Sequence, residues 1–557
     1  MNQLIECVPN FSEGNDMGII KQITDQMESV EGVTVLNVDP GKATNRTVVT
    51  MVGSPDAVVE AAYLAIKKAG ELIDMSKHKG AHPRMGATDV CPFIPVANIS
   101  MEETAEHAKR LAKRVGEELG IPVYLYEAAQ VNKERSNLSI IRAGEYEGFA
   151  QKILLPEWKP DFGPAIFDEK RGATVIGARD FLVAYNINLN TTSTRRANAI
   201  AFDIREAGRT KKINGKNVLD DQGKPVVIPG SLKCVKAIGW FIEEYGIAQI
   251  SINLTNIKVT PVHVAFDEAC KKATERGIRV TGSELVGLIP LQSLLDAGKY
   301  FLEKQQRSTG VSEKELIKIA VASLGLDQLT PFKPEERIIE YMIGGKKSGR
   351  LAKMDLVSFA DETASESPAP GGGSIAAYVG ALGVSLATMV ANLSAHKPGW
   401  DERWKEFGDQ AVVGQSLKDQ LLKLVDEDTA AFNKIMEAFG LPKSSETEKK
   451  ARTAAIQSAT LYAIEVPLKV MRLSLQSMDL IASMAETGNP NSISDAGVGA
   501  LCARTAVLGA GLNVKINASG YEDKDYVEEV LQLALKMEQD AIAKEMQILH
   551  LVNEKIK

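Results

Sequence analysis

The sequence has few cysteines, few aromatic residues and no strong excess of charge of either sign. Only five of its 557 residues are cysteine and none forms a CxxC pair, so neither a disulfide framework nor a zinc site is indicated. Acidic residues number 72 and basic residues 65, which gives a net charge of −7. Such mild acidity offers no general attraction to nucleic acid or anionic membranes, so neither is expected as a partner.

Motifs for nucleotides and for export are also missing. The sequence contains no GxxxxGK[ST] loop, and no GxGxxG motif follows a strand. Its first residues lack a basic segment followed by a long apolar stretch, so we expect no signal peptide and a cytoplasmic protein. One uncharged stretch, residues 371–395, is long enough to cross a bilayer, but its many Gly, Ala and Ser residues favour a helix buried inside a large domain.

Hydrophobic periodicity in the first hundred residues predicts a βαββαβ unit, the order of a ferredoxin-like fold. The expected strands begin with LIECVPN and continue at residues 33–38, 47–52 and 88–96, and the expected helices cover residues 16–30 and 56–72. The same order is expected again from residue 181. There, strands are expected at 181–189, 235–242, 248–254 and near 278, and helices at 194–206 and 261–275. A cleft between two such subdomains would be a natural ligand site.

The last third of the chain is expected to be all-helical. Long apolar stripes predict helices over residues 375–394, 404–439, 445–475 and 523–556. We therefore predict a multidomain protein with two α/β ferredoxin-like (βαββαβ) subdomains, 1–180 and 181–335, a linker at 336–352 and an all-α domain at 353–557. Helices of this length commonly bury their stripes against each other or against a second copy of the chain, so a homo-oligomer is expected.

Two of the six histidines, His78 and His82, lie close together in MSKHKGAHPRMG. The His-x3-His spacing fits a metal pair on a helix, but Gly80 and Pro83 disfavour a regular helix, so no metal site is expected. What remains is a loop before a strand, with an imidazole that can act as acid and base. A structural turn with a basic rim explains the same residues equally well.

Two segments of the helical third carry groups suited to chemistry. The turn SPAPGGGS, residues 367–374, leads into an apolar helix and can present backbone N–H groups to an anion, or its glycines can simply permit close packing. In LVDEDTAAF, Asp426, Glu427 and Asp428 cannot all be equally buried on one helix, and a carboxyl facing a cleft would have a raised pKa. A solvated acidic face is the competing interpretation. The turn NPNSISDAG, with Asp495, is interpreted as a helix entry.

Several of these motifs together resemble one enzyme family. The runs LIECVPNFSEG, NVDPGKATNRTVVTMVG and MSKHKGAHPRMGATDVCPFIPV are similar to formiminotransferases. FKPEERIIEY, SPAPGGGS and LVDEDTAAF extend the similarity to the deaminase half. The whole chain thus resembles the bifunctional formimidoyltransferase-cyclodeaminase family. The resemblance implies transfer of a formimino group from N-formimino-L-glutamate to tetrahydrofolate, and then cyclisation to 5,10-methenyltetrahydrofolate with release of ammonia, in histidine degradation and one-carbon metabolism.

The resemblance also assigns roles to residues. His82 matches the catalytic histidine of the transferase, and Asp428 matches the catalytic aspartate of the cyclodeaminase. The segment where the family contacts folate is made of Gly163, Pro164, Ala165, Ile166, Phe167, Asp168, Glu169, Lys170, Arg171 and Gly172. Tetrahydrofolate, in polyglutamylated form, is the implied co-substrate, with no tightly bound cofactor and no metal.

Further substrate contacts are candidates because of their charge or position. Cations suit the carboxylates of glutamate and of a polyglutamyl tail, Asp39 can orient the catalytic histidine, and the glycine-rich turn and Asp495 are candidates in the deaminase half. The candidates are Asp39, Lys77, Lys79, Arg84, Arg195, Arg196, Gly372, Gly373 and Asp495. A solvated surface position is the alternative for each cation. For the whole chain, the alternatives are a formiminoglycine-dependent transferase, a methenyltetrahydrofolate cyclohydrolase and an oligomeric scaffold.

Overall fold

The computed structural model describes residues 3–42, 44–80, 83–344 and 350–556. Contacts between residues divide the chain into two compact units. The first comprises Met1–Ser293 and Leu324–Gly345, and the second comprises Leu294–Ser323 and Lys346–Lys557. The predicted fold class, two α/β subdomains followed by a helical part, is confirmed. The exact boundaries predicted for the domains stay predictions.

The first sheet of the first unit has seven strands. They are β1 (Leu4–Cys7), β2 (Asn10–Phe11), β3 (Val33–Gly41), β4 (Arg46–Gly53), β5 (Thr88–Ala97), β6 (Val123–Glu127) and β7 (Thr174–Ala178). β4 pairs antiparallel with β3 and with β1 and β2, which in turn pair antiparallel with β5. This is the ferredoxin-like order that the sequence predicts. β7 and β6 then extend the sheet in parallel beyond β5, an addition that the sequence analysis does not contain.

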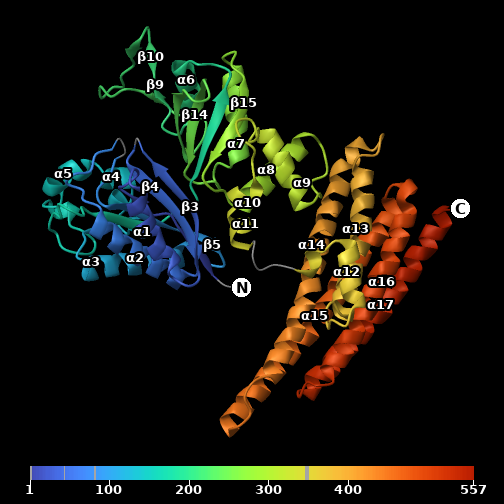
Figure 1. Ribbon diagram of the computed structural model, residues 1–557. Coiled ribbons are helices and arrows are strands. Elements are labelled where there is room, and N and C mark those ends of the chain that lie inside the picture. The colour runs from blue at the N-terminus through green and yellow to red at the C-terminus, as the bar shows by residue number, and fades with distance from the viewer. Residues whose placement is uncertain (1–2, 43, 81–82, 345–349, 557) are drawn as a thin grey trace. The chain divides into compact units, whose positions relative to one another are not determined.

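Three helices pack against one face of this sheet. They are α1 (Met17–Glu28), α2 (Pro55–Leu72) and α3 (Met101–Glu118), gathered on one side of the sheet in Figure 1. Their apolar stripes bury the side chains of Ile5, Cys7 and Met51, which point to the helix side. Because side chains alternate along a strand, Glu6 and Thr50 point to the opposite face. Part of that face is covered by α4 (Leu138–Ile141) and α5 (Glu145–Lys152), which pack near β5, β6 and β7.

The second sheet repeats the same topology with four strands. They are β8 (Val183–Leu189), β13 (Val235–Ile242), β14 (Ile247–Leu254) and β15 (Val280–Val286), in the order β13-β14-β8-β15. Its crossover helices are α6 (Thr194–Ile204) and α7 (Val262–Thr274). The order matches β3-β4-β1-β5 of the first sheet strand for strand, so the predicted second βαββαβ unit is confirmed. The polar stretch between α6 and β13 forms an exposed excursion of short strands, β9 (Arg209–Thr210), β10 (Lys212–Ile213), β11 (Lys216–Asn217) and β12 (Val227–Ile228).

The predicted linker region is only partly non-helical. The first unit ends with α10 (Pro334–Arg337) and α11 (Ile339–Gly344). The next described element is a short 3-10 helix of the second unit, η3 (Leu351–Lys353). Residues 345–349, the glycine- and lysine-rich part of the predicted linker, lie outside the described residues.

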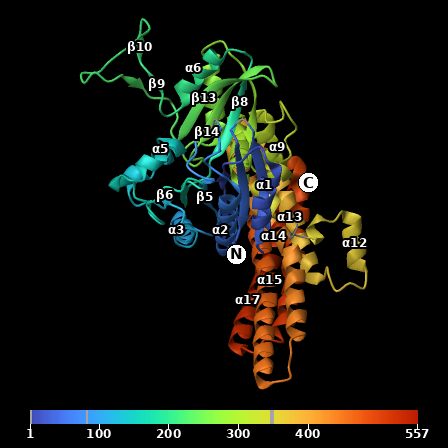
Figure 2. The same ribbon diagram turned by 60° about the vertical axis from the view of Figure 1, so that its left-hand side comes forward.

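The second unit is a bundle of long helices. Its elements are α8 (Leu291–Lys304), α9 (Glu313–Leu324), α12 (Leu356–Ala364), α13 (Gly372–Ala395), η4 (Asp401–Arg403), α14 (Trp404–Phe439), α15 (Glu446–Thr487), η5 (Pro490–Ser492), α16 (Ile493–Ala518) and α17 (Lys524–Ile556). Figure 2 shows α14 and α15 side by side, and α13 packs against α14 and α16. The segment between α8 and α9 packs on this bundle, where the side-chain amide of Asn392 donates to the carbonyl of Gly310 at 2.8 Å.

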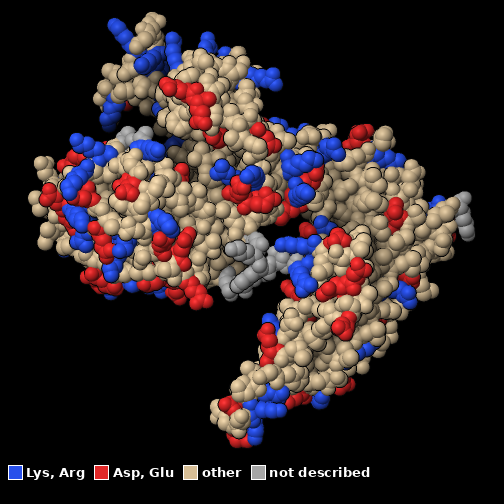
Figure 3. Space-filling view, viewed as in Figure 1, with Lys and Arg blue, Asp and Glu red and all other residues tan. Residues whose placement is uncertain are grey.

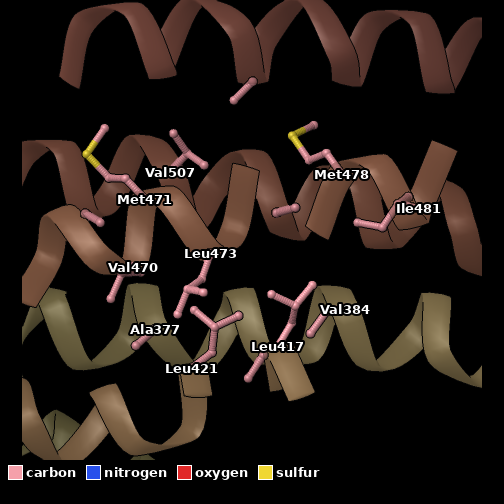
Figure 4. Packing of buried hydrophobic residues seen from close by; sticks show 14 of the residues in the cluster. Ala377, Val384, Leu417, Leu421, Val470, Met471, Leu473, Met478, Ile481 and Val507 are labelled. Atoms are coloured by element: carbon pink, nitrogen blue, oxygen red, sulfur yellow. The ribbon is translucent and has the colours of Figure 1, made fainter. Parts of the chain in front are cut away.

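Small residues explain how closely α13 packs. In the bundle core, shown in Figure 4, Ala377 and Val384 of α13 face Leu417 and Leu421 of α14, and all four are buried. Of the described helices, Gly372–Ala395 and Pro490–Ala518 are long and apolar enough to span a membrane, but 61% and 50% of their most apolar windows are buried inside the protein. Burial in the bundle therefore accounts for the uncharged stretch, as the sequence analysis expects.

Candidate active sites

Three motifs that are distant in the sequence meet at one end of the first sheet. The hydroxyl of Ser12 donates to the carbonyl of Gly86 at 2.7 Å. The amide side chain of Asn45 accepts from the backbone N–H of Gly14 at 3.0 Å and donates to the carbonyl of Lys79 at 3.0 Å. The turn after NVDPGK therefore holds the loop of residues 75–86 that carries the two histidines, the histidine loop. His82 itself, with residue 81, lies outside the described residues.

His78 is fixed by hydrogen bonds to both of its ring nitrogens. Nε2 lies 2.9 Å from the carbonyl of Asn45, and Nδ1 accepts from Nε of Arg84 at 3.2 Å. Because a guanidinium can only donate, Nδ1 must be the acceptor and Nε2 the protonated nitrogen. His78 therefore ties the loop to the Asn45 turn and has no ring nitrogen left for substrate.

Arg84 is also committed to contacts within the protein. Its guanidinium donates to both oxygens of Glu147, at 2.6 and 2.9 Å, and to Glu145 at 3.3 Å, and the residue is 7% exposed. These hydrogen bonds, that with Glu147 above all, raise the pKa of Arg84. A cavity of about 470 Å³ lies beside it, lined by Lys79, Gly80, Arg84, Gly144, Glu145 and Glu147. Arg84 thus shapes this cavity, while its charge is compensated by carboxylates.

A second cavity, of about 430 Å³, lies between the two sheets of the first unit, where the sequence predicts a ligand cleft. The first sheet supplies a polar floor that includes Asn10, Asn37 and Thr50. The second sheet and its neighbouring loops supply mainly apolar walls, with Phe181 and Leu288 among them. The charged residues that line it are Glu6, Asp39, Arg46, Arg142 and Arg179. A polar face opposite an apolar one suits a flat heteroaromatic ligand with hydrogen-bonding edges.

The charges along this cavity are coupled. Arg142 forms an ion pair with Asp89, a carboxyl that is 0% exposed and also accepts from the backbone N–H of Met85 at 3.0 Å. Burial raises the pKa of Asp89, and the neighbouring Arg142 opposes this rise. Burial also raises the pKa of Glu6, to about 7, with Arg179 opposing and Glu340 adding to the rise.

The structure separates the predicted substrate contacts of the transferase. Asp39 lines the cavity between the sheets. Lys77 is exposed and pairs with Asp74 at 2.8 Å, and Lys79 is exposed beside the cavity next to Arg84. Arg195 and Arg196 are exposed in the first turn of α6 and do not belong to the lining of either cavity.

The segment assigned to folate binding, residues 163–172, runs next to the histidine loop. The backbone N–H of Met75 donates to the carbonyl of Lys170 at 2.9 Å, and a Cβ on Gly172 would collide with the carbonyl of Met85. Within the segment, Arg171 pairs with Asp168 at 2.6 Å. Phe167 packs against the hydrophobic cluster that includes Phe149 of α5. None of these ten residues lines the cavity between the sheets.

In the helical unit, two motifs form one site: the glycine-rich turn, residues 367–374, and the acidic motif, residues 426–428. Oδ2 of Asp428 on α14 accepts from the backbone N–H of Ser374 at 2.8 Å and from its hydroxyl at 3.1 Å. Gly373 packs so closely on this carboxyl that a Cβ there would collide with Oδ1, and Asn513 of α16 lies next to Gly372. Burial raises the pKa of Asp428, while the two hydrogen bonds from Ser374 oppose the rise.

The three acidic residues of this motif have different surroundings, as the geometry of a helix requires. Asp426 accepts from the backbone N–H groups of Leu351 and Ala352, at 2.9 and 3.2 Å, and so holds η3 against α14. Burial raises the pKa of Tyr462 on α15, and the neighbouring Glu427 adds to this rise. Only Asp428 faces the glycine-rich turn, which makes it the carboxyl of this motif best placed for catalysis.

Asp495 lies elsewhere in the bundle. It sits in the first turn of α16, whereas the residue of that helix next to the glycine-rich turn is Asn513, about 27 Å further along. Within a single chain the structure therefore does not bring Asp495 to Asp428. Among the described residues no cluster of three His, Cys, Asp or Glu side chains could hold a metal ion.

Three family models match the chain in order. Residues 4–179 match the N-terminal subdomain of the formiminotransferase domain, residues 184–344 match the formiminotransferase domain, and residues 355–536 match formiminotransferase-cyclodeaminase. The class that these matches define is a two-part transferase joined to a helical deaminase.

Relatives cover both the whole chain and its parts. Formimidoyltransferase-cyclodeaminase of Mus musculus is 44% identical over 531 residues, which are 95% of each chain. Glutamate formimidoyltransferase of Thermoplasma acidophilum is 42% identical over 57% of this chain and 98% of its own length. Methenyltetrahydrofolate cyclohydrolase of Methylorubrum extorquens is 40% identical over 32% of this chain and 85% of its own. The chain belongs to the formimidoyltransferase-cyclodeaminase family, as the motifs predict.

Proposed function

We propose that this protein is a bifunctional folate enzyme. Its first unit transfers the formimino group of N-formimino-L-glutamate to N5 of tetrahydrofolate, and its helical unit cyclises the product to 5,10-methenyltetrahydrofolate and releases ammonia. The near full-length match to a formimidoyltransferase-cyclodeaminase carries this proposal, because it spans both units at once. Tetrahydrofolate, in polyglutamylated form, serves as co-substrate.

In the transferase, N5 of tetrahydrofolate attacks the formimino carbon and forms a tetrahedral species. The glutamate nitrogen must gain a proton before it can leave, and the N5 proton must be lost. His82 performs this transfer as a general acid and base. The cavity between the sheets binds the substrates, and Asp39, which lines it, lies toward the end of the sheet where the histidine loop is held.

In the cyclodeaminase, N10 attacks the carbon attached to N5, and the formimino nitrogen leaves as ammonia. N10 must lose a proton and the leaving nitrogen must gain one. Asp428 carries out both steps, because burial raises its pKa above the usual aspartate value and lets the carboxyl hold a proton more readily. The two hydrogen bonds from Ser374 keep its carboxyl in place.

Self-association, location and pathway are further parts of the proposal. Exposed apolar side chains on the long helices, including Leu512, Ile516 and Met546, support a homo-oligomer, and Figure 3 shows wide uncharged areas along the helical unit. The five cysteines are free thiols, which supports a reducing, cytoplasmic location. The donor places the enzyme in histidine degradation and one-carbon metabolism. Light scattering and cell fractionation test the first two points.

The experiment supplies N-formimino-L-glutamate and tetrahydrofolate and follows methenyltetrahydrofolate absorbance together with ammonia. Wild type should form both products. His82→Ala should fail to release glutamate but still cyclise added 5-formiminotetrahydrofolate, whereas Asp428→Ala should accumulate that intermediate. If wild type accepted formiminoglycine in place of formiminoglutamate, the donor assignment would be wrong and the two-site chemistry would remain.

The methenyltetrahydrofolate cyclohydrolase relative favours a second candidate function for the helical unit. Such an activity would open 5,10-methenyltetrahydrofolate with water, whereas cyclodeamination forms it. Incubating wild type with 5,10-methenyltetrahydrofolate distinguishes the two. Loss of absorbance faster than in a sample without enzyme, and absent in Asp428→Ala, would establish the hydrolytic activity.

A further inference from the structure

Glu6 is a buried carboxyl in the cavity between the two sheets. It lies on β1 between Ile5 and Cys7, whose side chains are both 0% exposed in the core under the helices. The alternation of side chains along a strand therefore turns Glu6 to the other face, where it lines the cavity and is 5% exposed. A carboxyl at an inward position of a strand is unusual, because burial disfavours its charged form.

Among the described residues, none donates a hydrogen bond to the Glu6 carboxyl. The charged or titratable groups that act on it are Arg179, Glu340 and the thiol of Cys7. Arg179 alone favours the charged form, and burial outweighs it. The Glu6 carboxyl opens onto the cavity, so a ligand bound there can supply the donors that the protein does not.

The position of Glu6 indicates which part of a ligand it meets. Glu6 pairs with Val52 on β4, whereas Asn10 and Asp39 both pair with Val48. Four residues of strand separate these rows, about 13 Å. The histidine loop is held at Asn45, which lies beyond the Val48 row, so Glu6 is at the end of the floor remote from the loop. It therefore faces a part of the ligand that does not react.

We propose that Glu6 binds the 2-amino-4-oxopyrimidine edge of the folate, with one carboxylate oxygen accepting from N3–H and the other from the 2-amino group. This assignment rests on the proposed transferase function. Two parallel donors match a carboxylate, and the pyrimidine ring is the part of tetrahydrofolate that lies away from the side chain at C6.

The formimino donor offers a competing pair of N–H groups, because its amidine becomes cationic when protonated. That group contains the reacting carbon, however, and must lie near the histidine loop. Asp39 occupies that end of the cavity and is the carboxylate suited to it. Glu6 thus binds the pyrimidine edge of the folate at one end of the cavity floor, and Asp39 binds the formimino donor at the other end.

A ligand analogue tests the assignment on the full-length protein. Tetrahydrofolate and its 2-deamino-2-methyl analogue differ by one hydrogen-bond donor, and their dissociation constants are measured by calorimetry. Wild type should bind the analogue about 10- to 100-fold more weakly. Glu6→Gln should bind tetrahydrofolate more weakly than wild type does and discriminate between the two ligands less than threefold, roughly. Equal discrimination by wild type and Glu6→Gln would overturn the assignment.

Glu127→Gln is the matched control. Glu127 ends β6 and also interacts with Arg179, but it is exposed and does not line the cavity, so this variant should discriminate as wild type does. A pH series adds a second measurement. Because N3–H and the 2-amino group donate, they require the charged form of Glu6, so the affinity of wild type for tetrahydrofolate should fall as the pH drops below about 7, and that of Glu6→Gln should not.

The outcomes separate this assignment from the proposed function. If wild type neither bound tetrahydrofolate nor transferred the formimino group, the proposed function would fail. If it bound and transferred but did not distinguish the analogue, only the role of Glu6 would fail. If Glu6→Gln did not fold, the wild-type ligand comparison and its pH dependence would still decide, since an analogue bound as tightly as tetrahydrofolate at every pH would refute the assignment.

Discussion

The carboxyl of Asp428 accepts a 2.8 Å hydrogen bond from the backbone N–H of Ser374, and this bond joins the two motifs of the helical unit. Ser374 lies in the first turn of α13 and Asp428 lies well inside α14. Backbone N–H groups in the first turn of a helix lack partners within the helix, so they are available to an acceptor from a neighbouring helix. The glycine-rich turn therefore positions a carboxyl, and it need not bind an anion from solution.

Gly373→Ala should damage cyclodeamination and spare transfer. A Cβ at residue 373 would collide with the Asp428 carboxyl, which would have to move away from Ser374. Because a displacement of about 1 Å at a catalytic group costs roughly 100-fold in rate, we expect a loss of that order. The measurement is the rate of ammonia release from added 5-formiminotetrahydrofolate, with glutamate release as the internal reference.

Gly371→Ala provides the matched control for this substitution. Gly371 belongs to the same turn and has an extended backbone that alanine can adopt, and the atom nearest to a Cβ there is 3.8 Å away. This variant should cyclise at nearly the wild-type rate. An equal loss in both alanine variants would mean that flexibility of the turn, and not the space at residue 373, limits the reaction.

Much of the fold was predictable because periodicity is a local property. The helix expected at 404–439 matches α14 residue for residue, and the strands of both βαββαβ units lie close to their expected positions. β6 and β7 are not among the expected strands. Residues 128–173, which include the short helices α4 and α5, separate β6 from β7. The two strands pair in parallel, and a parallel pair is not joined by a short turn that the sequence could reveal.

The sites were predictable only in part, because they depend on pairing between distant segments. The sequence analysis singles out both the glycine-rich turn and Asp428, but their contact spans 54 positions and follows from how α13 packs on α14. Glu6, Arg46 and Arg179 line the cleft and were missed. For Glu6 a signal was present, since a charge between Ile5 and Cys7 interrupts an otherwise apolar strand. The two arginines could not be found in this way, because the cavity that they line exists only where the second sheet lies opposite the first.

Asp428→Asn should stabilise the helical unit at neutral pH. Burial raises the pKa of Asp428 in the folded protein, so the folded state binds this proton more tightly than the unfolded chain does. The contribution of Asp428 to stability is therefore complete below the unfolded pKa and is lost as the pH rises through the folded pKa. Asparagine does not titrate, so its advantage in melting temperature should grow between about pH 4 and pH 7. A constant difference across this range would contradict the burial of the charged form.

His78→Ala and His82→Ala should have different effects on transfer. His78 uses both ring nitrogens to connect Asn45 with Arg84, so its loss loosens the loop without removing a proton carrier. We expect a fall in kcat/KM of about tenfold for His78→Ala and of at least about 100-fold for His82→Ala, the usual scale for a lost general acid or base. The pH dependence separates the two roles. His78→Ala should keep the wild-type pH profile, and a changed profile in that variant would contradict a purely positioning role for His78.

Asp89→Asn should weaken the first unit and leave the second unchanged. Asp89 is 0% exposed, accepts from the backbone of Met85 and pairs with Arg142, while Arg46 lies close enough to interact with it. Removing its charge leaves Arg142 without its partner beside the cavity, a type of change that costs about 3 kcal/mol. The readout is the urea concentration at which each activity is half lost. Transfer should fail at lower urea in the variant, and cyclodeamination should fail at the same urea concentration as in wild type.

The matched control is Asp56→Asn, whose carboxyl pairs with Arg110 but is 83% exposed. Exposed pairs contribute little, so Asp56→Asn should shift neither midpoint. Equal shifts in the two variants would mean that burial of Asp89 adds nothing to its pairing.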